Sequence, residues 1–143
     1  METYQGKAKK RPGWVWVISI FIFFSAAWTL LSFYLIYSGA IPLQPEQKAY
    51  FARLTSVDYS LTILLGITNL IGAVALFFLR RIAFYLFVGV LVLNSVMTLW
   101  HVLFKDWATA MGGAGLFGML IGYGLIVAVC LYAWKLKKSG VLI

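Results

Sequence analysis

Apolar residues dominate four long runs of the sequence, which contain no charged side chain apart from Asp58 near the start of the second run. The runs cover roughly residues 14–38, 57–79, 82–104 and 113–134. Each is long enough to cross a hydrocarbon core, which takes about 20 apolar residues at ~1.5 Å rise per residue. The pattern therefore predicts an all-α integral membrane protein with four transmembrane helices.

Composition supports this class, because 63% of the 143 residues are hydrophobic and 11% are charged, which is far more apolar than a soluble domain. The first run follows a basic N-terminus, as in a signal peptide. A secretory core has only about 7 to 15 apolar residues, so we expect the run to be retained as a helix. Residues 1–143 are predicted to form a single four-helix membrane domain.

Lysine and arginine are distributed unevenly between the segments that flank the runs. Nine lie in the two terminal tails and the connection between the second and third runs: Lys7, Lys9, Lys10, Arg11, Arg80, Arg81, Lys135, Lys137 and Lys138. Three lie in the other connections: Lys48, Arg53 and Lys105. The positive-inside rule then predicts an antiparallel up-down bundle in the inner (plasma) membrane, with both termini cytoplasmic. The net charge of +8 is explained by this topology and by anionic lipids, so nucleic acid is not an expected partner.

The longest segment outside the runs, residues 39–56, is expected to contain a short interfacial helix. Pro45 is a suitable first helical residue, and Tyr50, Phe51 and Leu54 then fall on one side of the helix. The alternative interpretation is a lid or a partner-docking loop. A soluble catalytic domain is excluded, because so few residues cannot build a core.

Polar residues form a stripe on each of the two central predicted helices. The stripes consist of Asp58, Thr62 and Asn69 on one helix and of Asn94, Thr98 and His101 on the other. Helices joined by a short turn are antiparallel neighbours, so Asp58 should meet His101, and Asn69 should meet Asn94 at mid-membrane. We predict a polar interhelical seam in which the two amides form a hydrogen bond.

Two interpretations of this seam are open. In the first it is structural, and Asp58 completes a capping box with Thr55 in the first helical turn. In the second, Asp58 and His101 form a proton-responsive or ion-binding pair, since ionisable residues in membrane segments are often functional.

Glycines form a further pattern on the last predicted helix, where Gly115, Gly118 and Gly122 lie along one face. Small residues at this spacing allow close approach of helix backbones. They serve either packing inside the bundle or docking of a second copy or another membrane protein.

Catalytic motifs are absent from the sequence. Cys130 is the single cysteine and His101 the single histidine, which excludes an internal disulfide and a histidine cluster for a metal. No metal, cofactor or enzymatic activity is expected.

Three functions remain. The first is a non-catalytic accessory or assembly subunit of a larger membrane complex. The second is a small homo-oligomeric transporter or channel that uses the polar seam. The third is a lipid- or quinone-binding membrane enzyme. Expected partners are membrane lipids and either a membrane protein or further copies of the chain.

Overall fold

The computed structural model describes residues 11–143, within which the chain forms five helices and no strand. They are α1 (Gly13–Tyr37), α2 (Pro45–Ala52), α3 (Ser56–Phe77), α4 (Ile82–Phe104) and α5 (Trp107–Lys138). All but α2 are long and apolar enough to cross a membrane. The all-helical class is therefore confirmed. The N-terminal lysines at positions 7, 9 and 10 lie outside the described residues.

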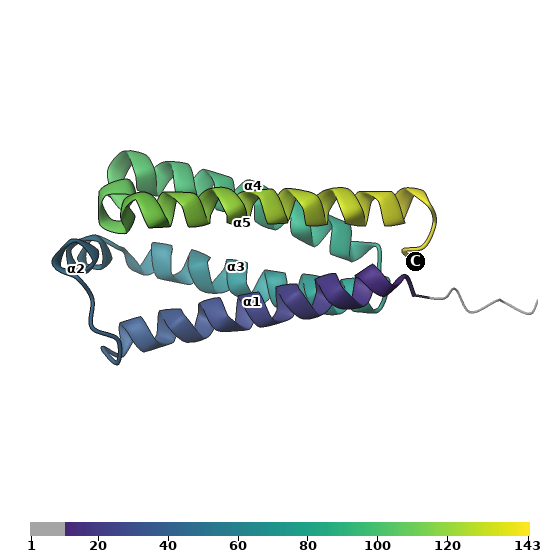
Figure 1. The fold of residues 1–143 in the computed structure, drawn as a ribbon, viewed down its shortest axis with the longest axis horizontal. Coiled ribbons are helices and arrows are strands. Elements are labelled where there is room, and N and C mark those ends of the chain that lie inside the picture. Colours follow the sequence, from purple (N-terminus) through teal and green to yellow (C-terminus); the bar gives the residue numbers. More distant parts are fainter. Residues whose placement is uncertain (1–10) are drawn as a thin grey trace, which may run out of the picture.

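The long helices form two layers, with α1 beside α3 and α4 beside α5 (Figure 1). The layers meet where α1 begins and α5 ends, which we call the termini end, and they diverge toward α2 at the opposite end, the α2 end (Figure 1). Close packing joins α1 to α3, α3 to α4, α4 to α5, and α2 to α5. The two layers are therefore connected chiefly through the α3–α4 hairpin and α2.

Local side-chain hydrogen bonds fix where α2 and α3 begin. The Asp58 carboxylate accepts a hydrogen bond from the Thr55 backbone N–H at 2.7 Å, and Thr55 Oγ1 accepts one from the Asp58 N–H at 3.4 Å. This confirms the predicted capping box, which satisfies backbone donors at a helix start. At the start of α2, Pro45 is the first residue, and the Gln47 side chain accepts a hydrogen bond from the Gln44 N–H.

The start of α5 differs from the prediction, because helical structure begins at Trp107 instead of residue 113. A kink at Gly112, with φ 63° and ψ −167°, separates this first turn from the rest of the helix. Glycine adopts such angles because it has no Cβ. The kink also brings Met111 so close to Gly115 that a Cβ at Gly115 would collide with the methionine side chain.

Two glycines of α3 allow its neighbours to approach closely. A Cβ built on Gly66 would lie 2.5 Å from Leu30 of α1, and one built on Gly72 would lie 2.9 Å from Phe87 of α4. Such small residues at a helix interface let side chains of the next helix reach the backbone.

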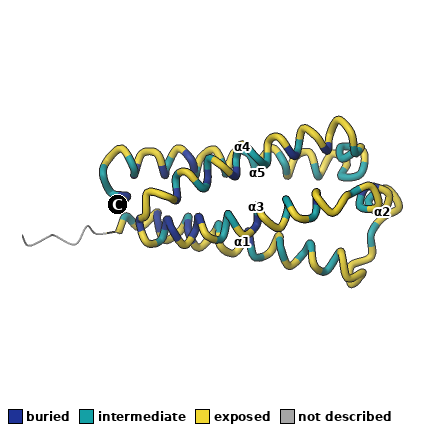
Figure 2. Tube along the Cα trace, turned by 180° about the vertical axis from the view of Figure 1, so that it is seen from behind, coloured by how far each residue is buried: buried dark blue, intermediate teal, exposed yellow. Residues whose placement is uncertain are grey.

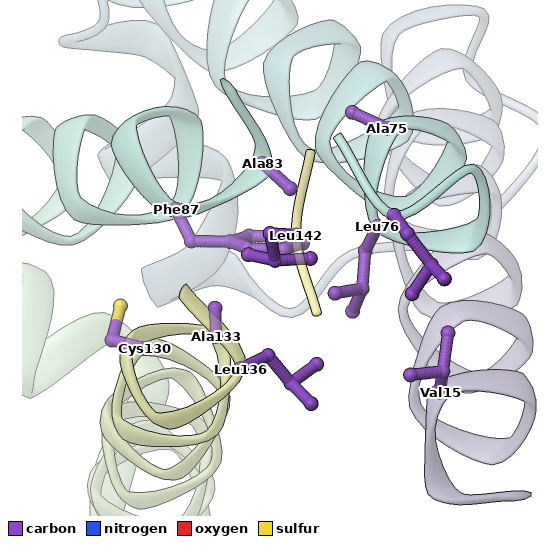
Figure 3. Close-up of a cluster of buried hydrophobic side chains, with 10 residues drawn as sticks. Val15, Ala75, Leu76, Ala83, Phe87, Cys130, Ala133, Leu136 and Leu142 are labelled. Carbon is purple, nitrogen blue, oxygen red and sulfur yellow. The ribbon is translucent and has the colours of Figure 1, made fainter. Parts of the chain in front are cut away.

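Most buried residues lie toward the termini end, whereas many residues along the long helices are exposed (Figure 2). All four long helices contribute to this termini-end cluster (Figure 3). Its members are Val15, Ala75, Leu76, Leu79, Ala83, Phe87, Cys130, Ala133, Leu136 and Leu142. The cluster holds the two layers together where they meet.

Residues 141–143, which we call the C-terminal strap, fold back onto the turn between α3 and α4. The Ile143 N–H donates to Leu79 O at 2.7 Å, and the Arg81 N–H donates to Ile143 O at 2.9 Å. The side chain of Leu142 is 0% exposed and lies within the termini-end cluster (Figure 3). Leu79 itself has a left-handed backbone with φ 56°, a conformation that is costly for leucine and is offset here by burial of its side chain.

Candidate functional site

A cavity of about 610 Å³ lies between the two layers, and residues from all five helices line it. This volume is within the range of about 300 to 1,000 Å³ that is typical of small-molecule sites. Much of the wall is apolar and includes Phe21, Leu65, Val90 and Ile126. Phe87 belongs both to the cavity wall and to the termini-end cluster, so that cluster closes one end of the cavity.

Charged side chains are absent from this wall. Among the described residues that line the cavity there is no Asp, Glu, Lys or Arg. The polar groups are supplied by hydroxyl, amide, imidazole and indole side chains. The cavity therefore offers hydrogen bonds but no fixed charge for an ionic ligand.

Three buried side chains form a hydrogen-bonded chain at the α2 end of the cavity. The Tyr50 hydroxyl lies 3.0 Å from His101 Nδ1, and His101 Nε2 lies 3.0 Å from Asp58 Oδ1. Asp58 is 6% exposed and His101 is 9% exposed. The chain connects α2, α4 and α3, so it fixes the position of the short helix over the cavity.

The partners of His101 determine which atoms donate. Burial, with smaller contributions from the Asp58 carboxylate and Tyr59, raises the pKa of Tyr50 to about 12. Its hydroxyl is therefore protonated at neutral pH. In the tautomer with the imidazole proton on Nε2, the hydroxyl donates to His101 Nδ1 and Nε2–H donates to Asp58. Both contacts of the imidazole are satisfied in this tautomer.

The charges around this chain are paired within the protein. Lys105 Nζ lies 3.6 Å from Asp58 Oδ2 and donates a hydrogen bond to Arg53 O at 2.6 Å. Arg53 in turn forms an ion pair with Asp106. Asp58 and Asp106 are thus each matched by a basic side chain, and neither is available to a ligand without breaking a contact.

The predicted polar seam is only partly formed. Asp58 and His101 meet as the antiparallel register predicted. Thr62 and Thr98 both line the cavity but have separate partners. Thr62 Oγ1 donates to Asp58 O at 2.9 Å, and Thr98 Oγ1 accepts from the Tyr123 hydroxyl at 2.9 Å.

The predicted hydrogen bond between Asn69 and Asn94 is not formed. Both side chains are half-buried and line the cavity, and in the described part of the chain neither amide has a hydrogen-bond partner. Equal distances from the turn bring two residues together only if the helix axes are parallel, whereas α3 and α4 diverge from their turn toward α2 (Figure 1). The prediction of direct pairing was therefore wrong, and the cavity separates the layers at this level.

The three glycines of the predicted α5 face have different surroundings. Gly115 is constrained by Met111 of its own helix. A Cβ at Gly118 or Gly122 would meet nothing within 4 Å. Gly122 lines the cavity, while Gly118 is exposed. Close packing inside the bundle therefore does not explain Gly118 and Gly122.

Several lining residues were not predicted as parts of a site. Tyr50, Phe51 and Leu54 were expected on one side of the short helix, and all three line the cavity. The spacing of these residues predicted that they share one side of the short helix, but no sequence pattern indicated which part of the protein that side would face. For Tyr123 the sequence carried no signal beyond an aromatic residue in an apolar run.

Within residues 11–143, no group of three or more His, Cys, Asp and Glu side chains is arranged to hold a metal ion. No family model matches the chain, and comparison with curated proteins and with solved structures also gave no match.

Proposed function

We propose that the chain spans the inner (plasma) membrane four times, with both termini in the cytoplasm. The four long helices are apolar, and large hydrophobic side chains on their outer surfaces are exposed, including Trp28, Ile71 and Leu99. Such a surface is unfavourable in water and suited to lipid. The excess of basic residues in the tails and the α3–α4 turn supports the orientation.

Within this membrane protein, the function best supported is non-catalytic binding of a small lipophilic molecule in the cavity. The single observation that carries this proposal is the cavity of about 610 Å³ between the two layers, with a largely apolar wall and a few polar groups. Sites for small molecules have this composition and commonly lie between the helices of bundles. This function corresponds to the lipid- or quinone-binding interpretation of the sequence, without the enzymatic activity.

Entry from the bilayer is consistent with the packing of the helices. Both α1 and α5 line the cavity, yet they are not among the closely packed helix pairs. A lipophilic molecule could pass between them without crossing the charged residues at the α2 end.

Docking of a partner helix on α5 is a second candidate, which corresponds to the accessory-subunit interpretation. It is favoured by the open space over Gly118, because close helix association in membranes uses small residues. Gly118 and Gly122 belong to the same helix, but Gly118 is exposed whereas Gly122 lines the cavity. The two functions can therefore be tested separately.

The test compares Gly122→Leu with Gly118→Leu. Leucine at Gly122 should fill part of the cavity, since the residue lines it and has open space at its Cβ position. We expect saturable binding of tritiated dodecanol by the protein in nanodiscs, a strong loss of that binding in Gly122→Leu, and unchanged binding in Gly118→Leu.

Absence of saturable binding to the unmodified protein, or equal loss in both variants, would contradict the binding function. For the second candidate, Gly118→Leu should dissociate the complex that is purified in mild detergent, as measured by light scattering, while Gly122→Leu leaves its mass unchanged. An assembly that survives Gly118→Leu would exclude this docking face.

A further inference from the structure

Two cavity-lining amides retain their full hydrogen-bonding capacity. Asn69 on α3 and Asn94 on α4 both line the cavity, and no hydrogen bond within the described residues involves either side chain. Each amide offers an acceptor oxygen and two donor hydrogens. Three other polar lining residues, Tyr50, His101 and Tyr123, already have partners in the protein.

An unpaired amide in apolar surroundings is costly, and in a membrane helix no bulk water compensates for it. The cost is removed if a molecule in the cavity pairs with the amide. Because the amides lie on different helices and do not pair with each other, a polar group between the layers would be the common partner that the fold lacks.

The charges of the cavity restrict that polar group further. No Asp, Glu, Lys or Arg lines the cavity among the described residues, and Asp58 and Lys105 lie 3.6 Å apart as partners of each other. A carboxylate, phosphate or ammonium group at the level of the amides would therefore be buried without a counter-ion, which is strongly unfavourable. A hydroxyl or carbonyl oxygen would have no such penalty.

Resting on the proposed binding function, we propose that the cavity selects an uncharged amphiphile whose hydroxyl or carbonyl oxygen pairs with Asn69 and Asn94. The hydrocarbon part of the ligand lies along the apolar wall. The amides accept from a hydroxyl and donate to a carbonyl, so both oxygen types fit. The chain of Tyr50, His101 and Asp58 closes the α2 end and does not bind the ligand's polar group.

The experiment uses probes that have similar hydrocarbon chains and differ in their polar group. Tritiated dodecane, dodecanol, methyl decyl ketone, dodecanoate and dodecylammonium are each titrated onto the protein in nanodiscs, with empty nanodiscs as background. One neutral hydrogen bond gained on binding should favour the alcohol and the ketone over dodecane by about three- to tenfold in Kd. Both charged probes should bind more weakly than the alcohol.

Variants then locate the preference. Asn69→Leu and Asn94→Leu should each reduce the preference for the alcohol over dodecane, and the double variant should abolish it while dodecane still binds. Matched controls lie one residue away on the same helices. Thr68→Val and Ser95→Ala remove hydroxyl groups that bond to their own helix backbone and do not line the cavity, so they should leave the preference unchanged.

The outcomes separate this inference from the proposed function. If all probes bind equally, or a charged probe binds best, the selection for an uncharged oxygen is overturned while ligand binding stands. If both leucine variants keep the full preference, the asparagines are not the recognition groups. If no probe binds saturably, the binding function fails and this inference fails with it. The ranking of probes on the unmodified protein tests the ligand class even where a variant does not fold.

Discussion

Nε2 of His101 lies 3.0 Å from Oδ1 of Asp58, so the last turn of α4 is joined to the first turn of α3. The Tyr50 hydroxyl on the other imidazole nitrogen adds α2 to the same chain. The hydrophobic cluster holds the two layers at the termini end, and this polar chain holds them at the α2 end. The cavity lies between these two points of attachment.

The Asp58 carboxylate should contribute much more to stability than the carboxylate of Asp106, which lies at the same end. Asp58→Asn places an amide NH₂ against donors that now pair with the carboxylate, including Thr55 N–H and Lys105. Leaving a buried group unsatisfied costs about 1 to 3 kcal/mol. We expect a clearly lower free energy of unfolding in mild detergent.

The matched control is Asp106→Asn, which removes the same charge from an ion pair whose side chains are 52% and 70% exposed. Exposed ion pairs contribute less than about 1 kcal/mol. Equal destabilisation by the two substitutions would contradict a structural role for the buried chain.

Alkaline pH should destabilise the protein partly through Tyr50. Its pKa in the folded protein is raised from 10.0 to about 12, so above pH 10 the unfolded chain releases a proton that the folded chain keeps. Stability from this group is therefore lost as pH rises from about 10 to about 12. Tyr50→Phe lacks this loss, and its thermal unfolding temperature should fall less steeply over that interval. Parallel curves for the two proteins would contradict the burial of a protonated hydroxyl.

The kink in α5 should distinguish two adjacent glycines. Gly112 has a positive φ of 63°, so Gly112→Ala should lower stability by about 1 to 2 kcal/mol. Gly113 lacks a positive φ, and a Cβ there would meet nothing within 4 Å. Gly113→Ala should therefore be neutral or stabilising by up to about 1 kcal/mol. Thermal unfolding of both variants measures the difference, and a reversed order would show that the helix does not bend at Gly112.

The C-terminal strap should depend on one side chain. Leu142 is 0% exposed and Ile143 is 72% exposed, while the backbone of both is bonded to the α3–α4 turn. Leu142→Ala leaves a cavity in the termini-end cluster and should cost about 2 kcal/mol or more. Ile143→Ala retains the backbone contacts and should cost little. Similar unfolding temperatures for both variants would show that the strap does not stabilise the core.

Topology can be tested by cysteine labelling in intact cells. Lys48→Cys and Lys138→Cys both place a thiol at an exposed position, whereas the native Cys130 is buried. With cytoplasmic termini, a membrane-impermeant maleimide should label residue 48 in intact cells and residue 138 only after lysis. Labelling of residue 138 alone in intact cells would reverse the orientation.

Helix positions could be predicted from the sequence because they depend on local properties. Apolar length located the four long helices, and Thr55 with Asp58 marked the start of α3. The start of α5 at Trp107 was missed because the helix bends at Gly112. The composition of this segment does not reveal the backbone angle of that residue.

The candidate site was predictable where it depended on distance from the α3–α4 turn. That distance brought Asp58 to His101. Distance from the turn did not predict the separation of Asn69 from Asn94. The angle between α3 and α4 follows from packing at Gly72 and Phe87 and from the cluster at the termini end. The partner of His101 on α2 could not be predicted, since no sequence pattern fixes how the short helix that carries Tyr50 is oriented relative to the long helices.

The C-terminal strap also sets an order for assembly during synthesis. Leu142 completes the cluster that joins the layers, and Ile143 bonds to the turn between α3 and α4, which is translated some sixty residues earlier. Until the C-terminal strap has left the ribosome, the termini-end cluster lacks the fully buried side chain of Leu142. The buried junction at the termini end can therefore be completed only after residue 143 has been translated.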